Sequence, residues 1–364
     1  MKIKIQFKKS ITVAFVFVWF VSISFGQRAP IDHRQEYQNS AQKILRKYEH
    51  HVYKLKPSKA GHMGLRLWRN YKDDEYKYLL LQGINHTSQA LDKIVNNGLD
   101  KRSIYLYVKE KNAKYKASTK KKKLRKETFT TFPKYRFMAT KVLRHVARLD
   151  ELGLRHKNHQ DFMKLLHSYN FEKAFTNPQM IKAWGAQLAN QVYWLHHLGV
   201  ADYRVKFAKA VARTYPDEED GLLNKQQFQN KIYTLTHIII AASGYYRHQV
   251  DYQEHKEIID YFRANTDLII ERCKEDIIIE VGLSLLLVDE SIPEIETIRA
   301  YINSKVDPKK KMVLSENGKS SISQGEHRNI IAVLLLDWQG CSPIPTSVDI
   351  QPMEGLLSES LVFK

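Results

Sequence analysis

Helical periodicity constrains this chain more than any other feature of its sequence. Apolar residues recur at spacings of three and four along almost the whole chain, and long alternating runs are rare. This pattern is typical of α-helices and predicts an all-α protein. One short strand is expected at residues 104–108. The expected helices, separated by Pro- or Gly-containing breaks, cover residues 33–55, 62–82, 87–98, 134–152, 159–173, 179–198, 201–214, 225–246, 254–272, 276–288, 294–304 and 327–338.

Two kinds of helix alternate along this pattern. Segments such as 277–288 are apolar all round, as expected of buried helices, whereas segments such as 254–272 are charged on one side. Each apolar segment carries a polar side chain, and these side chains are separated by 45, 47, 43 and 47 residues. Such a period is typical of one helical hairpin per repeat. The polar residues of the series are His145, Asn190, His237, Glu280 and His327.

This period predicts stacked helical hairpins that form an incomplete (α/α) toroid. If the inner helices run parallel around one axis, the five polar groups lie at similar heights and meet near one mouth of the ring. An irregular helical solenoid with ordinary buried polar residues is the alternative. We expect residues 27–340 to form this single domain and residues 341–364 to be an irregular, proline-containing tail.

Residues 1–26 have the sequence of a secretory signal peptide. Four lysines precede an uncharged run of 15 residues from Ile11 to Phe25, and the small residues Ser24 and Gly26 fit a cut before Gln27. The run is short for a membrane span of about 20 residues, so an uncleaved anchor is the weaker alternative. We therefore expect a periplasmic or secreted protein without a transmembrane segment after cleavage. Export argues against functions that use ATP, NAD or nucleic acid inside the cell.

Positive charge is concentrated in one segment of the mature chain. The formal net charge is +19, of which +4 belongs to residues 1–26 and +11 to residues 101–126, which leaves +4 for the rest. An exposed, solvated loop or frayed helix is the plain interpretation of residues 101–126. For an exported protein, the partners that we expect for this segment are an anionic glycan, lipopolysaccharide or lipid headgroups, and we expect no nucleic acid.

Glu280 is the strongest single indication of a functional site. It is the only charge between Asp276 and Asp289, and a lone buried carboxylate is costly unless it is paired, metal-bound or protonated. Asp276, Glu280 and Ser284 are spaced by four and share one helix face. The structural alternative is that Asp276 caps the helix and Glu280 bonds a neighbouring arginine.

Two histidines are candidates to act with Glu280. Tyr233 and His237 lie four residues apart, so His237 can serve as a general base or metal ligand and Tyr233 as a proton donor. His327 stands near the start of the last helix. His237, Glu280 and His327 can hold zinc or iron with open positions for substrate, or act as an acid/base set without metal. Hydrogen-bonded core histidines and a helix-capping segment are the structural alternatives.

A weaker candidate site lies near the start of the mature chain. His62, Arg66 and Arg69 are spaced so that all three share one helix face. Together they can bind a carboxylate, sulfate or phosphate through charge-assisted hydrogen bonds. A solvated helix face is the alternative.

Three motifs of the chain resemble those of a known family. They are Tyr233-x-x-Thr236-His237, Asp276-x-x-x-Glu280-Val281-Gly282 and Gly325-Glu326-His327-Arg328-Asn329. Over nearly the whole mature chain, the sequence resembles the exported bacterial proteins of DUF3541, a domain-of-unknown-function family. This resemblance implies a signal peptide and an all-helical, toroidal domain. It implies no activity and no catalytic residue.

Together, these features favour an exported enzyme, a hydrolase or a lyase, that acts on an acidic polysaccharide or envelope glycan in a polar cleft. Tyr233, His237, Glu280 and His327 are its candidate catalytic residues. The substrate class follows from charge and from analogy between folds. A non-catalytic envelope protein that binds an anionic polymer or a partner through residues 101–126 is the main alternative, and a helical scaffold without a site is a third.

Overall fold

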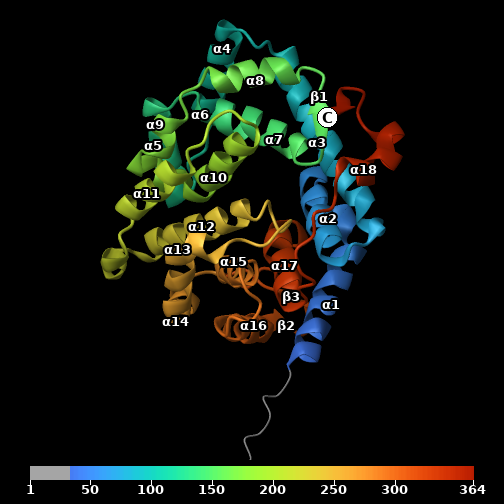
Figure 1. Ribbon diagram of the computed structural model, residues 1–364, viewed down its shortest axis with the longest axis vertical. Coiled ribbons are helices and arrows are strands. Elements are labelled where there is room, and N and C mark those ends of the chain that lie inside the picture. The colour runs from blue at the N-terminus through green and yellow to red at the C-terminus, as the bar shows by residue number, and fades with distance from the viewer. Residues whose placement is uncertain (1–32) are drawn as a thin grey trace, which may run out of the picture.

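The computed structural model describes residues 33–364, most of which are helical (Figure 1). The expected signal peptide lies outside the described residues. Within residues 33–364, no helix has the length and apolar character that crossing a membrane requires. The helices are α1 (Arg34–His50), α2 (Pro57–Tyr71), α3 (Lys77–Asn96), α4 (Lys101–Ala113), α5 (Lys120–Thr131), α6 (Tyr135–Phe137), α7 (Arg144–Asp150), α8 (His159–His167), α9 (Glu172–Phe175), α10 (Pro178–His197), α11 (Arg204–Thr214), α12 (Lys225–Ala242), α13 (Tyr252–Ala264), α14 (Thr266–Arg272), α15 (Glu275–Leu286), α16 (Glu294–Ser304), α17 (Ile322–Leu336) and α18 (Ser347–Ile350).

The helices that carry the candidate site contact one another in a closed order (Figure 1). Helix α2 packs on α3, α3 on α7, α7 on α10, α10 on α12, α12 on α15, α15 on α17, and α17 again on α2. Further helices pack on members of this ring: α1 on α17, α11 on α10 and α16 on α15. The predicted all-α class is confirmed, whereas a regular toroid stays a prediction.

Two helix crossings in this ring are so close that they require glycine. A Cβ atom at Gly61 of α2 would lie 2.4 Å from the Cα atom of Gly83 in α3. A Cβ atom at Gly185 of α10 would lie 1.9 Å from the hydroxyl oxygen of Thr234 in α12. Neither a backbone atom nor a buried hydroxyl moves aside cheaply. These contacts fix the helices that carry the candidate site residues.

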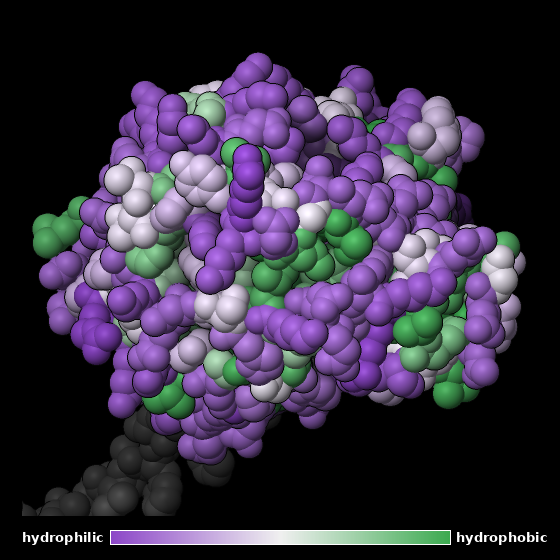
Figure 2. Space-filling view, turned by 90° about the horizontal axis from the view of Figure 1, so that it is seen from above, coloured by the Kyte–Doolittle hydropathy of each residue, from purple (hydrophilic) through white to green (hydrophobic). Residues whose placement is uncertain are grey.

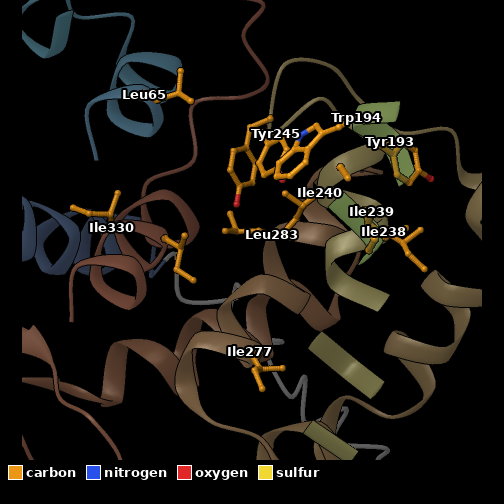
Figure 3. Packing of buried hydrophobic residues seen from close by; sticks show 14 of the residues in the cluster. Leu65, Tyr193, Trp194, Ile238, Ile239, Ile240, Tyr245, Ile277, Leu283 and Ile330 are labelled. Carbon is orange, nitrogen blue, oxygen red and sulfur yellow. The ribbon is translucent and has the colours of Figure 1, made fainter. Parts of the chain in front are cut away.

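The apolar helices form the core. In α15, every residue from Ile277 to Leu286 is buried, as its all-round apolar sequence predicts. Figure 3 shows Ile238, Ile239 and Ile240 of α12 packed near the aromatic rings of Trp194 and Tyr245. Seen from above, the surface is mostly hydrophilic, with smaller apolar areas between the polar side chains (Figure 2).

The basic segment is helical, and the strand expected at residues 104–108 is wrong. Residues 101–126 form α4 and most of α5, joined by a short connection. Asp100 begins α4 by accepting hydrogen bonds from the backbone N–H groups of Arg102 and Ser103, and Thr119 begins α5 in the same way. These N-caps favour a helix where the short apolar run alone indicated a strand.

The C-terminal residues 341–364 are more ordered than the irregular tail that the sequence predicts. They include α18 and a short strand, β4 (Leu361–Phe363), which pairs antiparallel with β1 (Leu154–His156). A second small antiparallel pair joins β2 (Val306–Asp307) to β3 (Met312–Val313). Because β1 directly follows α7, the tail is attached to the ring at that helix.

Candidate active site

Glu280 of α15 lies between side chains from two other helices. Its Oε2 atom accepts a hydrogen bond from the Thr236 hydroxyl at 2.9 Å and lies 3.6 Å from His237 Nε2. Its Oε1 atom lies 3.1 Å from His327 Nε2. The Glu280 side chain is only 1% exposed. The structure thus brings together Glu280, His237 and His327, which the sequence grouped by their spacing.

The helix around Glu280 leaves its carboxylate free for these contacts. Lys274 occupies the N-cap of α15 without a side-chain hydrogen bond, so Asp276 does not cap the helix as the structural alternative supposed. Ser284 donates its hydroxyl to the backbone carbonyl of Glu280 rather than to the carboxylate. Although burial opposes it, His237 and His327 hold the pKa of Glu280 below its ordinary value. The partners are therefore histidines rather than the arginine of the structural alternative.

His237 is held in a fixed orientation by Asn190. The Nδ1 atom of His237 lies 3.0 Å from the amide oxygen Oδ1 of Asn190, so it carries the proton when the imidazole is neutral. Burial lowers the pKa of His237 to about 4, and the ring is therefore neutral at pH 7. Its Nε2 atom has no hydrogen-bond partner among the described residues. The Tyr233 ring meets the imidazole edge-on, with 4.5 Å between centroids.

The cluster reaches solvent at His327 and His62. The His327 side chain is 29% exposed, and its ring centroid lies 5.6 Å from that of His62. His62 Nδ1 bonds Glu326 Oε1 at 2.8 Å, and burial lowers the pKa of His62 to about 3. Glu326, which sequence reasoning did not single out, is buried and orients the His62 ring.

Arg66 brings a buried guanidinium, one nitrogen of which lacks a partner among the described residues, to this cluster. Its side chain is 7% exposed, and its Nε atom has no hydrogen-bond partner within residues 33–364. Burial is the main cause of the lowered pKa of His62 and of His237, and the positive charge of Arg66 lowers both values further. The guanidinium lies 5.8 Å from the centroid of the Tyr246 ring, and the buried hydroxyl of Tyr245 is likewise unpartnered within residues 33–364. Buried polar groups without partners are rare and need an explanation, which a ligand would supply.

The backbone that presents these two tyrosines is unusual. Gly244, Tyr245 and Tyr246 all have positive φ angles, of 60°, 58° and 76°. Non-glycine residues adopt this region rarely, and such strain is concentrated at functional sites. No local sequence pattern predicts two consecutive tyrosines with a left-handed backbone conformation, and the sequence analysis did not identify them.

Arg69 and His145 do not join the cluster. The Arg69 guanidinium donates to Glu151 at 2.8 Å, to the carbonyl of Tyr245 at 2.7 Å and to that of Ile344 at 3.1 Å. Its hydrogen-bonding capacity is thus used within the protein, and the predicted anion-binding group is divided. His145 is bonded through Nδ1 to a backbone carbonyl of its own helix and lines a separate cavity.

The basic segment reaches the site, in contrast to the exposed, solvated loop or frayed helix that the sequence suggests. Lys121 of α5 is half-buried, and its Nζ atom lies 5.4 Å from the centroid of the Tyr233 ring. Burial, assisted by the charge of Arg125, lowers the pKa of Lys121 to about 8. Arg125 is turned inward as well, stacked on Trp184 at 4.2 Å.

The side chains of the cluster contact one another rather than a shared central position. In the part of the chain that the structure describes, no three or more His, Cys, Asp or Glu side chains are arranged to hold a metal ion. The Nε2 atom of His327 is hydrogen-bonded to one oxygen of Glu280, and the Nε2 atom of His237 lies beside the other oxygen. Zinc or iron at His237, Glu280 and His327 therefore stays a sequence prediction, and no chemical step below uses it.

Comparison with known proteins identifies the family. A family model described as a domain of unknown function (DUF3541) matches residues 37–362. This span contains the helices of the ring and every residue of the Glu280 cluster. The chain has no match among curated proteins or solved structures. The matched span covers most of the sequence, and the chain therefore belongs to the DUF3541 family.

Proposed function

We propose that this protein is an exported enzyme that cleaves an acidic polysaccharide by β-elimination at the Glu280 cluster. One observation carries the proposal. A neutral histidine, a protonated tyrosine and a buried arginine whose Nε atom lacks a partner in the described part of the chain meet beside Glu280, where the cluster opens to solvent at His327 and His62. Export itself rests on the sequence of residues 1–26.

Each of these groups matches one requirement of elimination from a uronate. The substrate carboxylate binds Arg66, which neutralises its charge and acidifies the adjacent C5 proton. His237 accepts that proton at Nε2, the electron pair forms a double bond between C4 and C5, and the C4–O bond breaks. Tyr233 donates its proton to the leaving oxygen. The products are an unsaturated sugar end and a new hydroxyl, and no water is consumed.

The protonation states favour elimination over hydrolysis. Glycosidases that hydrolyse with two carboxyl groups keep one of them protonated by raising its pKa. Here the pKa values of Glu280 and Glu326 both lie below their ordinary range, because neighbouring histidines outweigh the opposing effect of burial. Burial and the charge of Glu280 raise the pKa of Tyr233 well above its ordinary value. The tyrosine, not a carboxyl group, is therefore the available proton donor.

Glu280 serves as a positioning residue in this proposal. It lies 3.6 Å from the nitrogen that gains the proton, so its negative charge stabilises the imidazolium formed during the reaction. Asn190 fixes the opposite nitrogen of the ring, as the orienting group does in a catalytic triad. Lys121 adds a positive charge beside Tyr233, which suits an anionic chain.

The test uses residues 27–364 with a panel of uronate polymers and follows the ultraviolet absorbance of the unsaturated product. Tyr233→Phe should lower kcat about 10²- to 10⁴-fold, and Arg66→Gln should do the same or more. Tyr78→Phe, at an exposed tyrosine on α3, is the matched control and should keep the full rate. An unchanged kcat in Tyr233→Phe, or cleavage without an unsaturated product, would overturn the proposal.

A further inference from the structure

A cavity of about 190 Å³ lies between α2, α3 and α7. It is smaller than the roughly 300 Å³ typical of pockets for whole drug-sized ligands, so it suits a single chemical group. His62 lines this cavity, and its ring centroid lies 5.6 Å from that of His327, so the cavity adjoins the cluster. The basic residues of its wall are His62, His86, Lys141, Arg144, His145 and Arg148.

The cavity carries an excess of positive charge. Lys141, Arg144 and Arg148 face one carboxylate, that of Glu151. Glu151 already binds Arg69 at 2.8 Å and Arg148 at 3.4 Å. Within residues 33–364, no acidic side chain pairs with Lys141 or Arg144. Partial desolvation lowers the pKa of Lys141, and the neighbouring charge of Arg144 lowers it further.

The backbone gathers these cations on one side of a distorted helix. A π-helix (Met138–Leu143) passes directly into α7 at Arg144, and π-helical turns occur often at functional sites. Lys141, Arg144 and Arg148 stand at positions i, i+3 and i+7 and all line the cavity. Opposite them, the close crossing at Gly61 brings α2 and α3 together as the other walls.

We infer that this cavity binds a sulfate or phosphate group carried by the polymer, next to the sugar that reacts at Glu280. The cationic donors of Lys141, Arg144 and Arg148 stand along one wall, and Ser58 of α2 and His86 of α3 line the other two. A tetrahedral oxyanion accepts hydrogen bonds in all directions, whereas a planar carboxylate accepts within one plane. The link to the polymer rests on the proposed function. Binding of the oxyanion itself does not.

The test is calorimetric titration of residues 27–364 with inorganic sulfate, inorganic phosphate and acetate. Sulfate and phosphate should bind, and acetate should bind more weakly. Arg144→Gln and Lys141→Gln should each weaken sulfate binding about tenfold, because each removes a charge-assisted contact. Lys164→Gln, at an exposed lysine of α8, is the matched control and should bind sulfate as the wild type does.

The outcomes separate this inference from the proposed function. Absence of sulfate and phosphate binding, equal binding in Arg144→Gln, or acetate binding as tight as sulfate binding would overturn the inference, even if the enzyme cleaves uronate polymers. Sulfate binding that depends on Arg144, in a protein that cleaves no polymer, would support the cavity and count against the proposed enzyme. Circular dichroism of each variant checks that lost binding does not reflect unfolding.

Discussion

Protonation of His237 should destabilise the fold as the pH falls. Burial lowers the pKa of this imidazole from 6.5 to about 4, so the unfolded chain binds the proton first. The corresponding stability is fully present above pH 6.5 and is lost as the pH falls towards 4. Between pH 7 and pH 5, the difference removes about 2 kcal/mol from the free energy of unfolding, and below pH 4 about 3 kcal/mol.

The attraction between Glu280 and a protonated His237 opposes this effect of burial on the pKa. At 3.6 Å, a full charge pair in a medium of effective dielectric constant 20 gains about 5 kcal/mol. The lowered pKa means that desolvation outweighs this attraction in the free protein. If the attraction won instead, His237 would be charged at pH 7 and could not accept a proton from a substrate.

Urea denaturation at pH 7 and pH 5 decides between these cases. Other histidines add their own pH dependence, so the informative quantity is the difference between wild type and His237→Gln. The wild type should lose about 2 kcal/mol more than the variant over this interval. His50→Gln, at an exposed histidine of α1, should behave as the wild type does. Equal losses in wild type and His237→Gln, or a smaller loss in the wild type, would refute the neutral imidazole.

Three further substitutions test the packing and the site. Gly185→Ala should lower the free energy of unfolding by about 1–3 kcal/mol through overpacking, whereas Gly221→Ala, with open space around it, should cost little; thermal unfolding compares the two. Arg69→Gln should cost about 3–5 kcal/mol because it breaks the buried ion pair with Glu151, to which Arg148 at 3.4 Å then remains the only basic partner among the described residues. A loss below 1 kcal/mol in urea would contradict this. Lys121→Met should raise KM for an acidic polymer about tenfold with stability unchanged, and the exposed Lys122→Met should not.

The catalytic candidates were predictable because a polar side chain within an apolar helix is a strong signal. Glu280 stands out among ten consecutive buried positions of α15, and His237 and Asn190 lie on helices of the same kind. Buried polar groups need partners. The regular spacing of the series puts them at similar heights on neighbouring helices, so they can serve as partners for one another. The spacing could not say which pairs form, and His145 of the same series lies apart.

Other features depend on contacts that a local pattern does not contain. Lys121 looked like one more solvated lysine, because α5 is strongly basic and has little apolar periodicity. Packing against α10 turns its inner face towards the site. The expected helix 62–82 is divided between α2 and α3, because Lys72 adopts a left-handed φ of 57° and ends α2. No Gly or Pro in the sequence marks this break. The positive φ angles of Tyr245 and Tyr246 were not predicted either, because no glycine stands at these two positions.

Cleavage of a uronate polymer in water enriched in heavy oxygen tests the central claim most directly. Elimination consumes no water, so mass spectrometry should find products with an unsaturated end and no heavy oxygen, and Tyr233→Phe should abolish most of them. Products that each carry one heavy oxygen would show hydrolysis and contradict the account, as would the absence of cleavage in every acidic polymer of the panel.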